Sequence, residues 1–344
     1  MRFLLSIALT ALLLSGAIGL ALEYKIERVI EVGPGFGPTV GTVKWSPDGS
    51  RLAYCTEKSL AICDTLGVAT DKIDLGFAPH RYEWLSDREL IVNQFEVRSG
   101  PEVYGRIVRV DLTDGSISDL EEYSRAPTTS SVGMPESCQG PWLTVEGNAY
   151  YRTNVVWRPN RGPELTHIPQ SSYRDPSTSL SPERNHILEW GPDCLYLITG
   201  DLSDTVRLAP KPYSHIPARP LANKDLSYYI VGGTMCRIAD STYIVLDTLL
   251  GDFPPGTLVC GLSDYSFCPV GTEVLFTISC DDGVSYVVDR IGTFDYTTGE
   301  FATLDAEIGL ENCRAPAYSP DGLKIAFISD GKVYILFRMM NDVQ

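Results

Sequence analysis

The sequence has little positive charge. Its 344 residues include 28 Lys and Arg against 44 Asp and Glu, which gives a formal net charge of −16 at pH 7. Nucleic acids and anionic membrane surfaces are both bound through basic patches. We therefore predict no nucleic-acid partner and no stable insertion into a membrane. The acidic residues are scattered along the chain, which favours a soluble protein.

Motifs of common catalytic and metal sites are also missing. No Cys-x-x-Cys pair occurs, and the four histidines have no ligand-like spacing with the nine cysteines, so we predict no zinc site. There is no Gly-x-Ser-x-Gly elbow, no His-Glu-x-x-His helix and no phosphate-binding loop. We predict no cofactor, no metal and no catalytic residue. An enzyme site assembled from carboxylates of several repeats stays open as an alternative.

Only one long hydrophobic run is present, at the N-terminus. Arg2 precedes the apolar segment Phe3–Leu14, and small residues continue to Ala21. This order is typical of a secretory signal, with residues 1–21 removed. We predict one domain of residues 22–344 that is periplasmic or secreted, with a membrane anchor as the alternative. No other stretch approaches the ~20 apolar residues that a spanning helix needs.

The nine cysteines all lie after this leader. Export would permit disulfides. Because the number is odd, at least one thiol is free or pairs between chains. Several cysteines stand at strand positions, which also fits small buried apolar residues, and the sequence leaves any pairing open.

One segment occurs at both ends of the chain. Trp45-Ser-Pro-Asp-Gly-Ser-Arg-Leu-Ala-Tyr54 returns as Tyr318-Ser-Pro-Asp-Gly-Leu-Lys-Ile-Ala-Phe327. Five weaker copies lie between these two, at intervals of 38 to 58 residues, and the copies at Trp142 and Leu221 are the least similar. Their opening aromatic or apolar residues, which we call anchors, are Trp84, Trp142, Leu180, Leu221 and Phe267.

Each unit has the pattern of four strands. The anchor ends a short first strand, and Pro-Asp-Gly then favours a tight turn. An apolar run follows, as in Val274–Ile278, and a third and often a fourth strand come after it. Four strands in each repeat predict an all-β fold, a β-propeller of seven four-stranded blades, with six or eight blades as alternatives.

The ends of the chain predict how the ring closes. The last unit has room for three strands only, whereas Tyr24–Val32 alternates like a strand and belongs to no unit. We expect this N-terminal strand to complete the last blade, which would also remove an open sheet edge.

The two strong copies resemble the repeat of TolB-like β-propellers, a WD-repeat-like family with the Ser-Pro-Asp-Gly motif. The same repeat occurs in the propeller domains of prolyl-oligopeptidase-type peptidases. The resemblance covers the architecture of the chain after the leader, but only about 20 residues match sharply. It implies a ring with a central channel and binding loops at its two faces.

The segments before the anchors supply the candidate binding residues. In a ring of repeats, corresponding positions before successive inner strands lie at one end. Arginine side chains there would recognise carboxylates, although ordinary ion pairs with blade carboxylates are the alternative. The predicted binding residues are His80, Arg81, Tyr173, Arg174, Arg219 and Arg314.

From these patterns we expect an exported, monomeric, non-catalytic binding propeller. Its partner would be a protein, a peptide or a glycan at a channel mouth. The segment Ala126–Gly140, rich in Ser, Thr, Gly and Pro, is expected to be a loop that forms a lid or contact surface, with a disordered segment or a simple connection as the alternatives. The alternative is a hydrolase or lyase with acidic residues from several blades.

Overall fold

A computed structural model describes most of the repeat region. The described residues are 24–34, 43–77, 79–97, 103–125, 142–146, 149–158, 162–169, 177–180, 186–190, 194–199, 205–210, 220–250, 258–281, 287–304 and 308–340. Strands dominate them, and the 3-10 helix η2 spans Leu246–Leu250. The predicted all-β class is confirmed. Within these ranges no helix has the length and apolar character needed to cross a membrane.

The described strands form seven antiparallel sheets. In the first to third sheets the strands are β2 (Val43–Trp45), β3 (Arg51–Cys55), β4 (Ser59–Asp64) and β5 (Ala69–Asp74); β6 (Pro79–Ser86), β7 (Glu89–Val97), β8 (Val103–Asp111) and β9 (Ile117–Arg125); β10 (Trp142–Glu146), β11 (Ala149–Arg158) and β12 (Gly162–Pro169).

The fourth to seventh sheets complete the set. Their strands are β13 (Ser177–Leu180), β14 (His186–Trp190), β15 (Cys194–Thr199) and β16 (Thr205–Pro210); β17 (Leu221–Ala222), β18 (Tyr228–Val231), β19 (Thr234–Arg237) and β20 (Tyr243–Val245); β21 (Leu258–Phe267), β22 (Glu273–Asp281), β23 (Val287–Asp295) and β24 (Phe301–Thr303); β25 (Cys313–Tyr318), β26 (Lys324–Ser329), β27 (Lys332–Met340) and β1 (Tyr24–Pro34).

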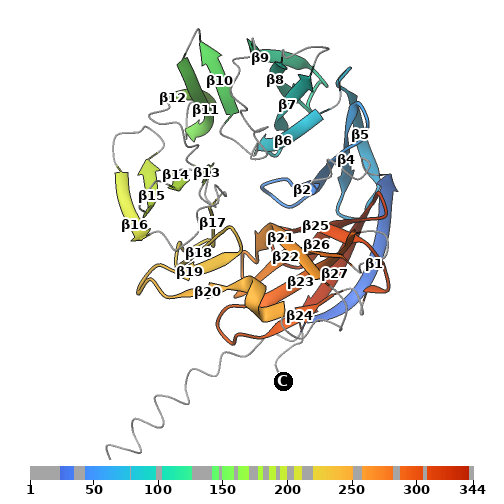
Figure 1. Cartoon of the computed structure of the whole chain (residues 1–344). Coiled ribbons are helices and arrows are strands. Elements are labelled where there is room, and N and C mark those ends of the chain that lie inside the picture. The colour runs from blue at the N-terminus through green and yellow to red at the C-terminus, as the bar shows by residue number, and fades with distance from the viewer. Residues whose placement is uncertain are drawn as a thin grey trace, which may run out of the picture.

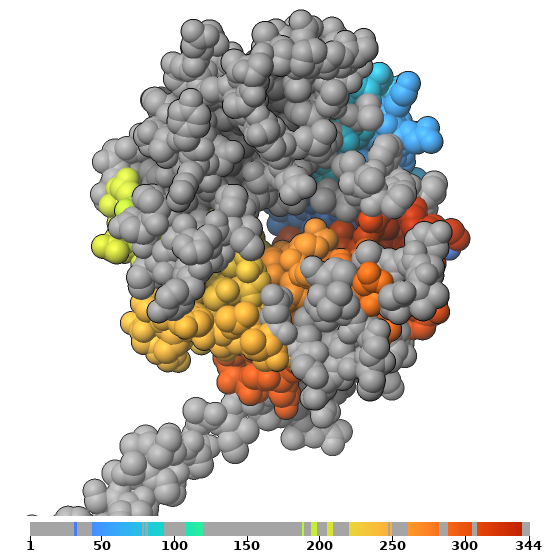
Figure 2. Space-filling view, viewed as in Figure 1, coloured from blue at the N-terminus to red at the C-terminus, as the bar shows by residue number. Residues whose placement is uncertain are grey.

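The sheets follow one another around a common centre, with the strands β2, β6, β13, β17, β21 and β25 on the inside (Figure 1). In the space-filling view the yellow surface of β17–β20 adjoins the orange surface of the next sheet (Figure 2). In such an arrangement of repeats, equivalent strands of successive units are expected to run in the same direction, with their starts at one end.

The N-terminal strand lies where the sequence predicts it. β1 pairs antiparallel with β27, from Tyr24 opposite Met340 to Pro34 opposite Lys332. It is the outer strand of a four-stranded sheet whose other members come from the end of the chain. The number of blades in a closed ring stays a prediction.

The anchors locate most first strands correctly. Trp45, Leu180, Phe267 and Tyr318 each end the first strand of a sheet. The prediction for Trp142 is wrong, because this residue begins β10 and the turn to β11 comes after Glu146. Trp142 has no Pro-Asp-Gly after it, and an aromatic residue alone does not fix the position of a turn.

The core lies between neighbouring sheets. Trp45 and Leu52 from the first sheet are buried against Ile328 and Phe337 of the seventh. Trp84, which is fully buried, packs with Leu60 on the other side of the first sheet. The first sheet therefore contributes two apolar faces, one to each neighbouring sheet.

None of the seven cysteines with described side chains forms a disulfide, and all seven are buried: Cys55, Cys63, Cys194, Cys236, Cys268, Cys280 and Cys313. Burial raises the pKa of the Cys55 thiol, and it raises the pKa of Cys63 to about 12. Both thiols stay protonated at neutral pH and pack as small apolar groups. The prediction that free thiols act in this way is confirmed. Cys138 lies outside the described residues.

Candidate functional site

Three of the six predicted binding residues lie in described inner strands. His80 and Arg81 are in β6, and Arg314 is in β25. The other three, Tyr173, Arg174 and Arg219, lie outside the described residues, as does the segment Ala126–Gly140. The described part of the predicted site therefore lies in the inner strands of the second and seventh sheets.

These inner strands share a break in their pairing. The register of β6 with β7 shifts between Pro79 and Arg81, so that His80 is an extra residue. The register of β25 with β26 shifts directly after Arg314. A β-bulge bends its strand and changes the direction of the side chains beside it, and bulges are common next to binding sites.

The sixth sheet has the same irregularity, which the sequence did not reveal. The register of β21 with β22 shifts between Ser263 and Ser266. Counted back from their anchors, His80, Ser263 and Arg314 are each the fourth residue before Trp84, Phe267 and Tyr318. We call the end of the inner strands that carries these bulges the bulge end.

Two bulge residues have an unusual backbone conformation. Asp264 has a φ of 53° and Ala315 a φ of 51°. Residues other than glycine rarely adopt this left-handed backbone conformation. Strained backbone conformations of this kind are concentrated at functional sites. Ala315 is buried and Asp264 is exposed.

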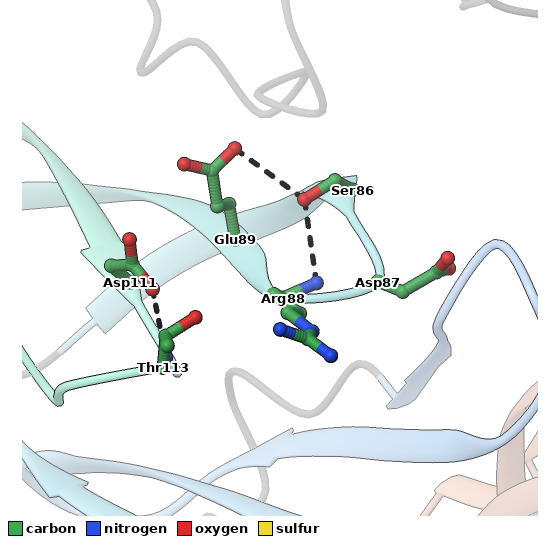
Figure 3. Close-up of a pocket in the computed structure, with 6 residues that line it drawn as sticks. All are labelled: Ser86, Asp87, Arg88, Glu89, Asp111 and Thr113. Carbon is green, nitrogen blue, oxygen red and sulfur yellow. Dashed lines mark hydrogen bonds between the residues drawn. The ribbon is translucent and has the colours of Figure 1, made fainter.

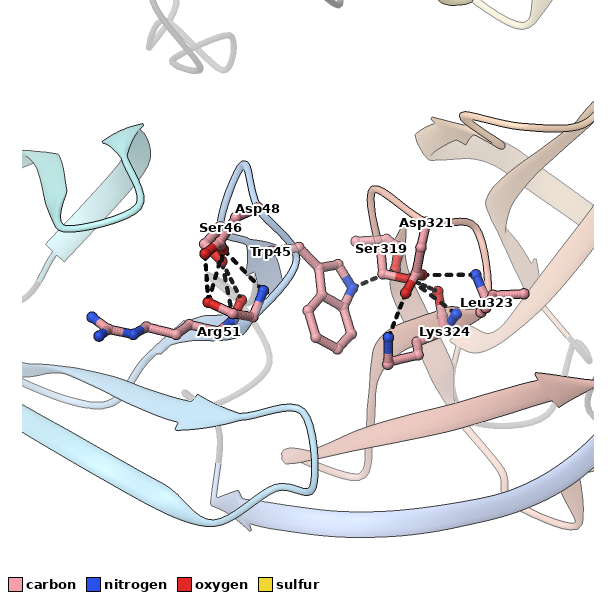
Figure 4. A network of polar contacts seen from close by, with 10 residues as sticks. Trp45, Ser46, Asp48, Arg51, Ser319, Asp321, Leu323 and Lys324 are labelled. Atoms are coloured by element: carbon pink, nitrogen blue, oxygen red, sulfur yellow. Dashed lines mark hydrogen bonds and ion pairs between the residues drawn. The ribbon is translucent and has the colours of Figure 1, made fainter.

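The opposite end carries the Ser-Pro-Asp-Gly turns, and we call it the turn end. In the first turn Ser46 Oγ donates to Asp48 Oδ1 at 2.6 Å, and the N–H of Arg51 donates to Ser46 Oγ at 3.0 Å. In the last turn Ser319 Oγ donates to Asp321 Oδ1 at 2.5 Å, and the N–H of Lys324 donates to Ser319 Oγ at 2.9 Å (Figure 4).

Both turn aspartates are held in their charged form. Burial alone would raise the pKa of Asp48, but hydrogen bonds from Ser46 and Ser50 outweigh it, so the pKa lies below its ordinary value. Burial likewise opposes ionisation of Asp321, yet its bonds to Lys324 and Ser319 lower the pKa. These carboxylates stabilise their own turns through hydrogen bonds, which is the structural role that the repeated motif predicts.

A shallow depression of about 370 Å³ lies at the turn end of the second sheet. Figure 3 shows its lining residues from the β6–β7 and β8–β9 turns. Its polar groups bind one another: Ser86 Oγ donates to Glu89 Oε2 at 3.4 Å, and Glu89 also pairs with Arg109. Asp87 Oδ1 accepts the N–H of Asp48 at 2.8 Å, which links the first two sheets. We therefore interpret the residues that line the depression as ones that stabilise the turns through these contacts.

No group of three or more metal-binding side chains occurs among the residues that the structure describes. The residues of the bulge end include Arg314 and Asp264, which carry charge, and the hydroxyl residue Ser263. Its guanidinium groups can bind a carboxylate and its carboxylate can accept a hydrogen bond.

Comparison with known proteins shows the fold. No protein-family model matches the chain, and no curated protein matches it. A chain in a structure described as "Crystal Structure of Mitotic Checkpoint Complex" is similar, with a TM-score of 0.52 and 12% sequence identity. The match covers 93% of this chain and 97% of that one. The described sheets and this likeness together identify the protein as a β-propeller.

Proposed function

We propose that this protein is an exported, non-catalytic binding propeller that works in the TolB-like manner. Its bulge end would present a channel mouth to a protein, peptide or glycan partner with an acidic group. The observation that carries the proposal is the position of His80, Arg81 and Arg314 at bulges of inner strands. The similar solved chain comes from a complex, which supports an interaction role.

The acidic character of the partner follows from the arginines. A guanidinium forms two parallel hydrogen bonds with a carboxylate, and this geometry gives specificity as well as affinity. Arg174 and Arg219 would add to the same end, since they precede the anchors Leu180 and Leu221. In a protein of net charge −16, this end would be a local exception that attracts an anion.

A matched pair of variants tests the proposal. The protein without residues 1–21 serves as bait in an envelope or culture-medium extract. Arg81→Ala/Arg314→Ala should lose the captured partner and keep the wild-type melting temperature. The control Arg51→Ala/Arg88→Ala removes the same charge at the turn end and should capture normally. Equal capture by both double variants would place binding elsewhere, and turnover of a captured small molecule would favour the enzyme alternative.

The export part of the proposal has its own test. Residues 1–21 should be absent from the protein isolated from its source, which the intact mass would show. Retention of Met1 in a membrane fraction would favour the anchor instead. The result is independent of what the bulge end binds.

A further inference from the structure

One buried hydroxyl joins the bulges of the sixth and seventh sheets. Thr277 lies in the middle of β22 and is 2% exposed. Its Oγ1 accepts the N–H of Ala315 at 2.9 Å and donates to Asp264 Oδ2 at 2.9 Å. A buried hydroxyl is costly unless it is hydrogen-bonded. Thr277 is bonded on both sides, and its two partners are the residues with left-handed backbones.

Thr277 therefore links the side chain of Asp264 to the backbone of Ala315. A left-handed conformation is unfavourable for most residues other than glycine. Thr277 provides a compensating hydrogen bond to each bulge. Arg314 directly precedes Ala315, so the turn of the backbone at Ala315 determines where the Arg314 side chain starts.

The carboxylate of Asp264 is fixed through one oxygen. Oδ2 accepts from Thr277 Oγ1 and from Ser263 Oγ at 3.1 Å. Within the described residues no hydrogen bond reaches Oδ1, and Asp264 is exposed. One oxygen is thus anchored, and the second can accept a hydrogen bond from outside the protein.

We infer that Asp264 is a ligand-binding residue of the bulge end and that Thr277 is its positioning residue. The inference rests on the proposed function and narrows the class of ligand. Arginine takes an acidic group, and Asp264 Oδ1 takes a hydrogen-bond donor beside it. The ligand is therefore an acid that carries a neighbouring hydroxyl or amine.

Two probes that differ by one hydroxyl test this inference. Citrate has three carboxylates and a hydroxyl, whereas tricarballylate has the same carboxylates without it. Titration followed by NMR should show citrate binding about tenfold more tightly, as a hydrogen bond to a charged group predicts. Asp264→Gly should abolish this preference, because it removes both carboxylate oxygens and leaves no side-chain group that could bind the hydroxyl. Glycine adopts a positive φ without strain, so the backbone conformation at this position is kept.

Thr277 variants separate positioning from general stability. Thr277→Val removes the hydroxyl at constant shape and should abolish the preference for citrate at temperatures well below its melting point. Thr277→Ser keeps the hydroxyl and should restore the preference. A stability defect alone would leave the preference intact in both variants.

The outcomes distinguish the two proposals. If citrate and tricarballylate bind equally and Arg81→Ala/Arg314→Ala weakens both, Asp264 is not a ligand-binding residue and the arginine site stands. If neither probe binds, or the arginine variant binds both normally, the proposal of an acidic ligand at this end fails, and the inference about Asp264 fails with it.

Discussion

The indole Nε1 of Trp45 lies 3.1 Å from the carbonyl oxygen of Ala317, which is 272 positions away in the chain. Trp84 has the same relationship to the first unit, because its Nε1 donates to the carbonyl of Lys44 at 3.0 Å. In both cases the acceptor directly precedes the anchor of the neighbouring unit. The hydrogen bond of Trp45 thus joins the first sheet to the last sheet. The equivalent hydrogen bond of Trp84 joins the second sheet to the first.

Replacement of Trp45 by Phe should lower the free energy of unfolding by about 1–2 kcal/mol. The ring would still fill most of the space, but the carbonyl of Ala317 would lose its donor in a mostly buried position. Urea unfolding would measure the change. Trp84→Phe should cost a similar amount, and an unchanged midpoint in both variants would show that the two bonds contribute nothing.

Deletion of residues 22–33 should lower the melting temperature of the whole domain. The deletion removes nearly all of β1 and leaves β27 with a free edge in a sheet of three strands. Calorimetry would show the shift, and removal of residues 1–21 alone is the control. A melting temperature equal to that of the control would rule out a structural role for the N-terminal strand.

Stability should fall on acidification below about pH 4, the ordinary range of an aspartate pKa. The pKa values of Asp48 and Asp321 are lower in the folded protein, so their ionised forms stabilise the fold at neutral pH. That stabilisation is lost as the pH falls through the folded values.

Asp48→Asn/Asp321→Asn should therefore show a weaker dependence of the unfolding free energy on pH between 5 and about 2. Denaturant unfolding across this range would measure the slope. Asp71→Asn, in the exposed strand β5, serves as the control for removal of a carboxylate. A wild-type slope in the double variant would contradict the conclusion that the ionised carboxylates of Asp48 and Asp321 stabilise the fold.

Gly322→Ala should destabilise the protein by about 2–5 kcal/mol. Gly322 has a φ of 71°, and an added Cβ would lie 2.5 Å from Cγ2 of Val270 in the neighbouring turn. The left-handed backbone costs roughly 1–2 kcal/mol, and overpacking adds about 1–3 kcal/mol.

Gly299→Ala is the matched control, because its φ is 78° and an added Cβ would meet nothing within 4 Å. It should cost the backbone strain only. Chemical unfolding of both variants gives the difference, which Val270→Ala should reduce when it is combined with Gly322→Ala. Equal losses for the two glycine variants would mean that Val270 moves aside freely.

The sequence predicts the parts of the fold that depend on neighbouring residues. Ser-Pro-Asp-Gly specifies its own turn, because Ser46 and Asp48 bond within a few positions. The strand at Tyr24–Val32 could be predicted from its alternation and from the missing fourth strand of the last unit. Trp142 was misplaced because no turn residues follow it directly, and Gly147-Asn148 comes only after Glu146, the end of β10.

The bulges of the sixth and seventh sheets could not be predicted, because the hydrogen bonds at them join residues that are distant in sequence. Thr277 bonds Ala315 across 38 positions and two sheets. The sequence placed Arg314 before an inner strand but gave no sign of the left-handed residue that follows it. The available signal for a polar link was Thr277, because its side chain carries a hydroxyl in the middle of the apolar run Val274–Ile278. The sequence did not indicate which residue this hydroxyl would bind.

The pairing of β1 with β27 has a consequence for folding order. A chain is synthesised from its N-terminus at about 5–20 residues per second. β1 therefore has to wait on the order of tens of seconds for Lys332–Met340, its partner strand. Throughout that time it exposes an unsatisfied edge that a second nascent chain could pair with instead. In this connectivity the strand that is synthesised first is the last to pair. Exchange of β1 between two copies of the chain is therefore the misfolding route that we expect.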